Sequence, residues 1–294
     1  MSKKLIALLS VISLISGCVN QNQKSSTTSS YDKIACTSVA TCEVLEKLDI
    51  PSELVVGIPQ SDNYSVPKRY QDATQLGTAM SPDMEVLKST NANLILSPNS
   101  LESDLAQKYE NLGIDSMFLN LKSTAGLYKS LEELGEILGK QEEASKAVEE
   151  FRSYMESYYK NKTSKSSLNV LILMGLPGSY VVATESSYVG SLVKLAGGEN
   201  VYGDGDGQDF LNINAEDMVD KKPDIILRTA HALPEQVQQM FAEEFKENDV
   251  WKHFDTVKNN KVYDLDAEKF GMSATFTYQE ALEDLGKILY EDAS

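Results

Sequence analysis

Short runs of apolar residues alternate along the chain with segments in which apolar positions recur every three or four residues. The first pattern is typical of buried strands and the second of amphipathic helices. The predicted strands cover Leu54–Gly57, Leu94–Ser97, Ser116–Leu119, Asn169–Met174, Val181–Ala183, Asp224–Leu227 and Val262–Asp264. The predicted helices cover Val39–Leu48, Pro82–Ser89, Leu101–Leu112, Gly190–Ala196, Ala215–Lys221, Pro234–Glu247 and Thr277–Tyr290. This alternation indicates an α/β fold with mainly parallel sheets.

The middle of the chain, from Thr124 to about Lys162, favours helix almost throughout. Gly135 and Gly139 are candidate break points, so the pattern predicts one helix followed by a longer one from about Lys140. A flexible linker would instead be rich in Gly, Ser or Pro. We therefore predict two Rossmann-like lobes, over residues 33–139 and 166–294, joined by a stiff spine helix over 140–165.

The two predicted lobes share a weak internal echo. Glu85 and Glu216 each lie 11 positions before the end of an apolar run, early in a short helix that leads into a strand. Helix–loop–strand units of this length are common, so the echo is only suggestive of related lobes.

The N-terminus has the pattern of an export signal. Lys3 and Lys4 precede a short apolar run, and small residues lead to Cys18. The run is too short to span a bilayer, so residues 1–17 are predicted to be a signal peptide. The order Leu14-Ile-Ser-Gly-Cys18 resembles a bacterial lipobox, which implies lipid attachment at Cys18. The Ser- and Thr-rich residues 18–32 are predicted to form a flexible tether. A lipid-anchored protein at the extracytoplasmic face of the membrane is therefore expected.

Charge and cysteine content narrow the function further. The chain has 27 basic and 44 acidic residues, a formal net charge of −17, which disfavours nucleic acid or an anionic membrane surface as a partner. Apart from Cys18, the cysteines are Cys36 and Cys42, whose spacing fits no zinc or redox motif. We predict two small buried thiols in preference to a disulfide.

Catalytic motifs are poorly represented, so a binding protein is expected instead of an enzyme. His231 and His253 are the only histidines, and no nucleophile elbow or phosphate-binding glycine loop occurs. The segment 203–207 (GDGDG) resembles part of a calcium loop but lacks the remaining ligands, so a plain turn is the better interpretation. His253 is predicted to be an ordinary packed or surface residue.

Met80 and His231 are the two candidate ligands. Ser81 and Pro82 predict a helix start, which leaves Met80 just before the helix without an apolar partner at Glu85. His231 follows a predicted strand, at the sheet edge where α/β folds bind ligands. Imidazole and thioether both suit iron. From the residues alone, a methionine filling a gap in the core and an ordinary histidine remain open alternatives.

Longer stretches of the chain resemble a known family. NVLILMGLPGSYVVAT at 169–184, LAGGENV at 195–201, WKHF at 251–254, VKNN at 257–260, VYDL at 262–265 and FG at 270–271 are similar to the IsdE-type haem-receptor lipoproteins of Gram-positive bacteria. In the first lobe, PKRYQD at 67–72 and GTAMSP at 77–82 fit the same family. The resemblance extends from about Ile34 to Tyr290.

This resemblance implies the fold of periplasmic binding proteins with a helical backbone (class III), with haem held between the lobes by one Met and one His. Met80 and His231 fall on those positions. Glu85 and Glu216 fit the glutamates by which related receptors dock onto an ABC permease, which works with its ATPase. A cell-surface or secreted haem donor and a monomeric receptor are also implied.

For the haem propionates, the hydroxyls and amides of Thr37, Ser38, Ser61, Asn63 and Tyr64 are the candidates. The loop 61–64 lacks the basic residue that the family often presents there and carries an insertion.

Three alternatives differ in chemistry. A ferric-siderophore or cobalamin receptor of the same fold is the nearest, although anionic siderophores usually need several cations. A receptor for free zinc or manganese would need three or four hard or imidazole ligands, and the chain has two histidines. A haem-degrading enzyme would need an open iron site, which ligation by Met and His does not leave.

Overall fold

The computed structural model describes residues 31–61, 64–161 and 167–292. The expected signal peptide, the lipid attachment at Cys18 and residues 18–30 of the expected tether lie outside the described residues, as does Asn63. Within the described residues, no helix has the length and apolar character needed to cross a bilayer.

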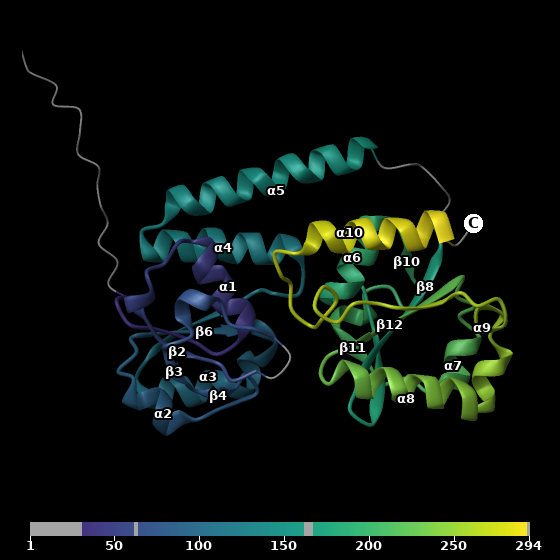
Figure 1. Ribbon diagram of the computed structural model, residues 1–294, viewed down its shortest axis with the longest axis horizontal. Helices are drawn as coiled ribbons and strands as arrows, with labels where there is room; N and C mark the ends of the chain where they lie inside the picture. Colours follow the sequence, from purple (N-terminus) through teal and green to yellow (C-terminus); the bar gives the residue numbers. More distant parts are fainter. Residues whose placement is uncertain (1–30, 62–63, 162–166, 293–294) are drawn as a thin grey trace, which may run out of the picture.

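The first lobe contains a five-stranded parallel sheet (Figure 1). Its spatial order is β3 (Thr74–Gln75), β2 (Val55–Ile58), β1 (Ile34–Cys36), β6 (Leu94–Pro98) and β7 (Asp115–Leu119). The connecting helices are α1 (Val39–Lys47), α2 (Met84–Ser89) and α3 (Glu102–Leu112), and a separate hairpin joins β4 (Gly77–Thr78) to β5 (Ser81–Pro82). Strands β1 and β6 are wholly buried, which is why their sequences are continuous apolar runs.

The second lobe contains a mixed six-stranded sheet. Its main path is β11 (Phe210–Leu211), β9 (Ser179–Ala183), β8 (Asn169–Leu176), β12 (Ile225–Ala230) and β13 (Val262–Asp264), and β10 (Glu199–Asn200) also pairs with β8. Strand β9 runs antiparallel to both of its neighbours, and the other pairs are parallel. The helices are α6 (Tyr188–Ala196), α7 (Ala215–Val219), α8 (Pro234–Glu247), α9 (Asp255–Lys258) and α10 (Tyr278–Lys287).

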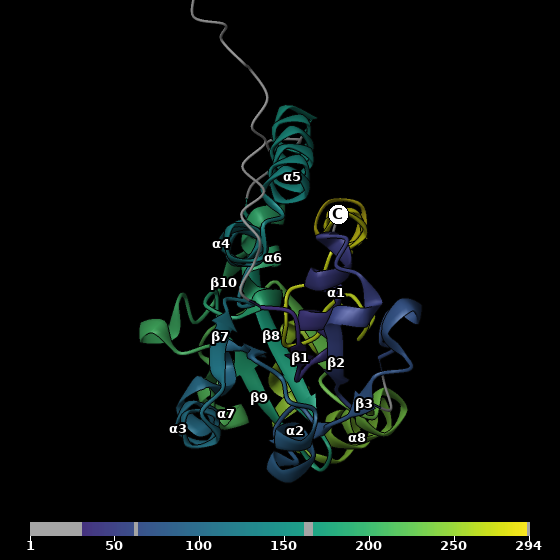
Figure 2. The same ribbon diagram turned by 90° about the vertical axis from the view of Figure 1, so that its left-hand side faces the viewer.

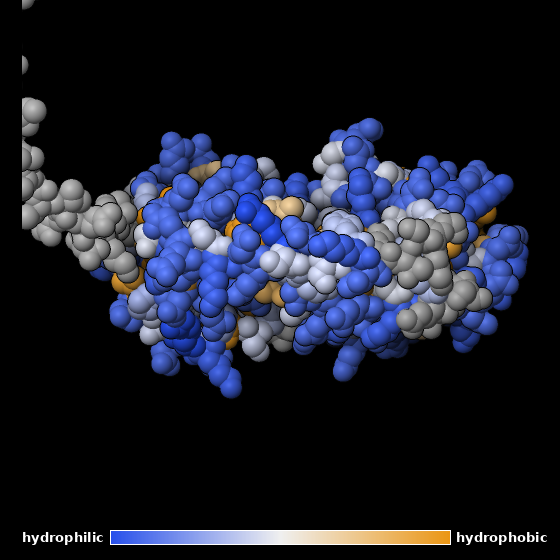
Figure 3. Space-filling view, turned by 90° about the horizontal axis from the view of Figure 1, so that it is seen from above, coloured by the Kyte–Doolittle hydropathy of each residue, from blue (hydrophilic) through white to orange (hydrophobic). Residues whose placement is uncertain are grey.

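Two long helices stand between the sheets in the sequence: α4 (Thr124–Leu138) and α5 (Gln141–Asn161). Of the two predicted break points, only Gly139 ends a helix, because it adopts the left-handed conformation (φ +69°). Gly135 stays within α4, where a Cβ atom would lie 2.6 Å from the Cβ of Ala144. Glycine there lets α4 and α5 approach closely. Viewed from the side of these helices and α10, the surface is largely hydrophilic (Figure 3).

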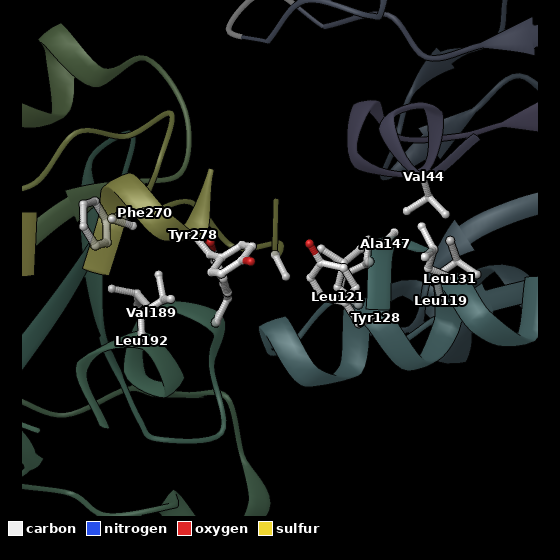
Figure 4. Packing of buried hydrophobic residues seen from close by; sticks show 14 of the residues in the cluster. Val44, Leu119, Leu121, Tyr128, Leu131, Ala147, Val189, Leu192, Phe270 and Tyr278 are labelled. Atoms are coloured by element: carbon white, nitrogen blue, oxygen red, sulfur yellow. The ribbon is translucent and has the colours of Figure 1, made fainter. Parts of the chain in front are cut away.

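One hydrophobic core extends through both lobes. Tyr278, at the start of α10, makes edge-to-face contacts with Tyr128 of α4 and with Phe151 and Tyr154 of α5, at centroid distances of 5.9, 5.5 and 5.5 Å. Figure 4 shows Tyr278 and Tyr128 between the buried side chains of the two lobes. Nearby, the amide of Ala274 donates a hydrogen bond to the carbonyl of Leu121 (2.7 Å). The lobes are thus joined by buried aromatic packing as well as by the chain.

The predicted α/β fold is confirmed, and the differences are local. Strands β1, β3, β4, β5, β10 and β11 were not among the predicted strands; all have two or three residues, too few to show a repeat. The predicted start of α2 at Ser81 and Pro82 is wrong. These two residues pair with β4, and Asp83 caps the helix by accepting hydrogen bonds from the amides of Glu85 and Val86. The prediction failed because a second cap residue stood two positions later.

The aromatic contacts of Tyr278 predict that two tyrosine substitutions will destabilise the protein to different degrees. Tyr278→Ala should lower the free energy of unfolding by about 3 kcal/mol or more, because it leaves a cavity in the shared core. Tyr159→Ala on α5 removes a ring that is 51% exposed and should cost less than about 1 kcal/mol. Urea denaturation followed by circular dichroism measures both; equal destabilisation would contradict the central position of Tyr278.

Candidate ligand-binding site

Met80 lies at the apex of the hairpin between β4 and β5. Gly77 pairs with Pro82 and Thr78 with Ser81, so Ala79 and Met80 form a two-residue turn. The Met80 side chain is 70% exposed, the largest exposed fraction among the large hydrophobic residues described. Met80 therefore does not fill a gap in the core, which was the open alternative.

His231 lies directly after β12 at the carboxyl end of the strand. Its amide donates a hydrogen bond to the carbonyl of Gly175 (3.0 Å), which continues the pairing of β12 with β8 by one residue. The imidazole is half-buried, and burial lowers its pKa below the ordinary value. At neutral pH the ring is therefore uncharged, which is the form that binds a metal.

Leu233, which no sequence pattern singled out, lies two positions after His231. It precedes Pro234 at the start of α8, has a left-handed backbone (φ +48°), and is 40% exposed. A left-handed conformation is costly for a leucine, and such strain clusters at functional sites. Two of the four exposed large hydrophobic residues described are associated with the candidate ligands. Met80 is itself a candidate ligand, and Leu233 lies two positions after the other, His231.

The two candidate ligands are carried by elements on the same side of the molecule. In Figures 1 and 2, α2, α7 and α8 lie on the side opposite α5. The hairpin with Met80 leads into α2, and His231 precedes α8. Glu85 on α2 and Glu216 on α7 are both exposed on these helices. The candidate ligands and the candidate docking residues are thus carried by loops and helices of this one side.

The hydroxyl candidates in the first loop are largely engaged within the lobe. Thr37 is buried; its amide donates to the carbonyl of Leu96 (3.0 Å), and its hydroxyl lies within hydrogen-bonding distance of that carbonyl (3.1 Å) and of the Ser97 hydroxyl (2.9 Å). Ser38 caps α1, where its Oγ accepts a hydrogen bond from the amide of Thr41 (3.2 Å). Ser38 is half-buried, so of these two residues it is the more accessible.

The second candidate loop touches the opposite lobe. The Tyr64 hydroxyl donates to the carbonyl of Ala267 (3.1 Å), and the Tyr64 amide donates to Oγ of the exposed Ser61 (3.1 Å). A Cβ atom at Gly271 would lie 3.0 Å from the Tyr64 hydroxyl, so glycine there permits this contact. Tyr64 thus connects the lobes directly.

A further contact between the lobes was not foreseen from the sequence either. Lys122, after β7, forms an ion pair with Asp209, before β11 (2.9 Å). The pair lines a cavity of about 40 Å³, which has room for water but not for a porphyrin. Residues of both lobes line it, among them Asn99 and Tyr188. Ion pairs between residues so far apart in sequence leave no periodic signal.

Each of the three arginines of the chain is paired with a carboxylate. Arg228 on β12 forms a two-pronged ion pair with Asp264 on β13 (2.8 and 2.6 Å) and lies over the ring of Phe245. The other arginines, Arg69 and Arg152, pair with Asp49 and Glu149. Among the described residues, no group of three or more His, Cys, Asp or Glu side chains is arranged to hold a metal ion. Cys36 and Cys42 are buried free thiols.

The chain matches known proteins in sequence and in fold over most of its length. A model of the family described as "Periplasmic binding protein" matches residues 34–269. The chain belongs to the periplasmic binding protein family. Its members are binding proteins, so the expectation that the chain is not an enzyme is confirmed.

The most similar relatives include a receptor named for heme uptake. The chain is 38% identical over 289 residues to the "High-affinity heme uptake system protein IsdE" of Staphylococcus aureus, covering 98% of this chain and 97% of the relative. The structure of S. aureus IsdE complexed with heme has a TM-score of 0.82 at 38% identity, covering 88% of this chain and 99% of that one.

Two further solved structures extend the comparison. An ABC transporter substrate-binding protein of Listeria monocytogenes EGD-e has a TM-score of 0.80 at 44% identity, covering 89% of this chain and 99% of that one. The vitamin B12 binding protein BtuF of Vibrio cholerae has a TM-score of 0.71 at 15% identity, covering 90% of this chain and 98% of that one. At that identity the likeness to BtuF concerns the fold alone. The chain is therefore similar to extracytoplasmic substrate-binding proteins of ABC transporters.

Proposed function

We propose that the chain captures haem, with Met80 and His231 as the two axial ligands of the iron, and delivers it to an ABC permease for iron acquisition. The observation that carries this proposal is the exposure of Met80, whose side chain is 70% exposed at the apex of its hairpin. The 38% identical relative whose structure contains heme supports the same ligand.

The chemistry of the two side chains suits haem held as cargo. A thioether and a neutral imidazole occupy both axial positions without adding charge, and no coordination site remains open for oxygen activation. The exposed Leu233 beside His231 offers apolar surface to the porphyrin ring. The lowered pKa of His231 keeps its nitrogen free of a proton that would compete with the iron.

For the propionates, we propose hydroxyl and amide donors of the loops at the first sheet. Ser38, Ser61 and Tyr64 are the accessible candidates, Thr37 would act by fixing the loop, and Asn63 lies outside the described residues. A ferric siderophore is less well supported, because all three arginines of the chain are paired with carboxylates.

For delivery, we propose that Glu85 and Glu216 dock onto cationic residues of the permease, which works with its ATPase. Both side chains are exposed on short helices of the same side of the molecule. A lipid anchor at Cys18 would hold the monomeric receptor at the extracytoplasmic face of the membrane, where a surface or secreted haem donor can reach it.

Haem titration tests the ligands. The wild-type complex should show the absorbance spectrum of six-coordinate, low-spin haem. Met80→Leu and His231→Ala should each weaken haem affinity at least tenfold, about 1.4 kcal/mol, and change that spectrum. Met240→Leu and His253→Ala are the matched controls and should leave it unchanged. An unchanged spectrum in both ligand variants would refute the assignment, and tight ferric-siderophore binding without haem binding would refute the proposed ligand.

Ligation by His231 predicts that haem affinity depends on pH, which the same spectrum can follow. Iron and proton compete for the His231 nitrogen, so haem affinity should fall as acid protonates the ring. Because burial lowers the pKa of His231 below 6.5, the six-coordinate spectrum should persist below that pH and be lost only in more acidic solution. Loss of the spectrum at or above pH 6.5 would contradict this environment for His231.

If Glu85 and Glu216 dock onto the permease, their removal should impair haem transport without impairing haem binding. Glu85→Ala with Glu216→Ala should retain the haem spectrum but reduce haem-dependent growth of cells that rely on this receptor. Glu142→Ala, on the exposed surface of α5, is the control and should support normal growth. Normal growth of the double variant would exclude these residues as the docking contacts.

A further inference from the structure

Met80 differs from the other methionines in its access to solvent. Eight of the nine methionines lie in the part of the chain that the structure describes, and Met80 alone among these eight is exposed. The remaining seven are buried or half-buried: Met84, Met117, Met155, Met174, Met218, Met240 and Met272. Because oxidation of a thioether requires contact between its sulfur and the oxidant, Met80 should react first.

The hairpin keeps the Met80 side chain accessible. The Gly77 carbonyl accepts a hydrogen bond from the amide of Gln60, and the Leu76 carbonyl accepts one from Asp83 (both 2.7 Å). Gly77 has φ +88°, and a Cβ atom there would lie 3.1 Å from the Ser81 carbonyl oxygen. The stem is therefore closed on itself by the Asp83–Leu76 bond and tied to the lobe by the Gln60–Gly77 bond, which opposes an inward movement of Met80.

Thiols that could consume the same oxidant within the folded body are shielded. Cys36 and Cys42 are fully buried, and burial together with the neighbouring Cys36 thiol raises the pKa of Cys42. A buried, protonated thiol reacts slowly, since the thiolate is the reactive form. Met80 is thus the most accessible sulfur among the described residues.

We infer that Met80 is a selective oxidation site, at which hydrogen peroxide switches off haem capture. The inference rests on the proposed role of Met80 as an iron ligand. In the reaction, the sulfur of Met80 gives two electrons to peroxide, the O–O bond breaks, an S–O bond forms, and water leaves. Methionine sulfoxide reductases, which draw electrons from thiols, reverse the step.

Oxidation changes the ligand in two ways. The sulfur becomes a polar, chiral sulfoxide centre, and its electron density is withdrawn toward oxygen, so it no longer presents a soft thioether to iron. The other proposed ligand, His231, contains no sulfur and does not undergo this reaction. The site therefore loses one of its two ligands while its fold is retained.

The test treats the purified full chain, without haem, with a small excess of hydrogen peroxide and removes the peroxide. Peptide mass spectrometry then follows each methionine, and haem titration follows affinity. Met80 should be oxidised at least tenfold faster than Met240 or Met272, and haem affinity should fall at least tenfold. Treatment with methionine sulfoxide reductase should restore it. In Met240→Leu the loss should be unchanged, and in Met80→Leu peroxide should cause no further loss.

The outcomes separate this inference from the proposed function. Comparable oxidation rates for Met80 and Met240 would overturn the inference. So would full haem affinity after complete Met80 oxidation, if Met80→Leu does weaken binding. Full affinity in both the oxidised protein and Met80→Leu would instead refute Met80 as a ligand, and the inference with it. Prior loading with haem should slow Met80 oxidation, whereas an unchanged rate would instead refute Met80 as a ligand.

Discussion

The shared hydrophobic core is the constraint on which the arrangement of this protein depends. Tyr278 of the second lobe packs against Tyr128 and Phe151, so the helices α4, α5 and α10 are joined by two buried rings and one half-buried ring. Separating the lobes would expose these rings to water, at a cost that grows with the apolar area uncovered. The loops that carry Met80 and His231 are therefore held in a fixed relation by packing far from the site itself.

Much of this fold could be predicted from the sequence, because the helices and strands follow from regular patterns of apolar residues. The apolar runs of β6 and β12 and the helical spacing of α4 and α5 each recur over enough residues to identify the element. The α2 start was predicted wrongly, since Ser81-Pro82 and Asp83 both have cap chemistry and only tertiary pairing with β4 decides between them. The mixed direction of the second sheet likewise depends on β9, whose reversal over a short turn has no periodic signature.

The site could be predicted only in part, and for a physical reason. Residue type and position drew attention to Met80 and His231, while the family resemblance suggested haem. Three features had no sequence signal, because each depends on contacts or torsions set by the folded chain: the Lys122–Asp209 ion pair, the Tyr64–Ala267 hydrogen bond and the backbone conformation of Leu233. Thr37 shows the converse: a hydroxyl of suitable type is engaged by Leu96 and Ser97.

Under the proposed role of Met80, the hairpin that carries this residue also bears on how quickly the protein can bind a ligand. Across the described residues the two lobes share one buried core, which opposes rigid-body movements between them of the kind that take microseconds to milliseconds. Rotation of one exposed side chain on a tied turn takes on the order of picoseconds to nanoseconds. Under the proposed function, encounter with the ligand, not rearrangement of the lobes, would then set the rate of loading.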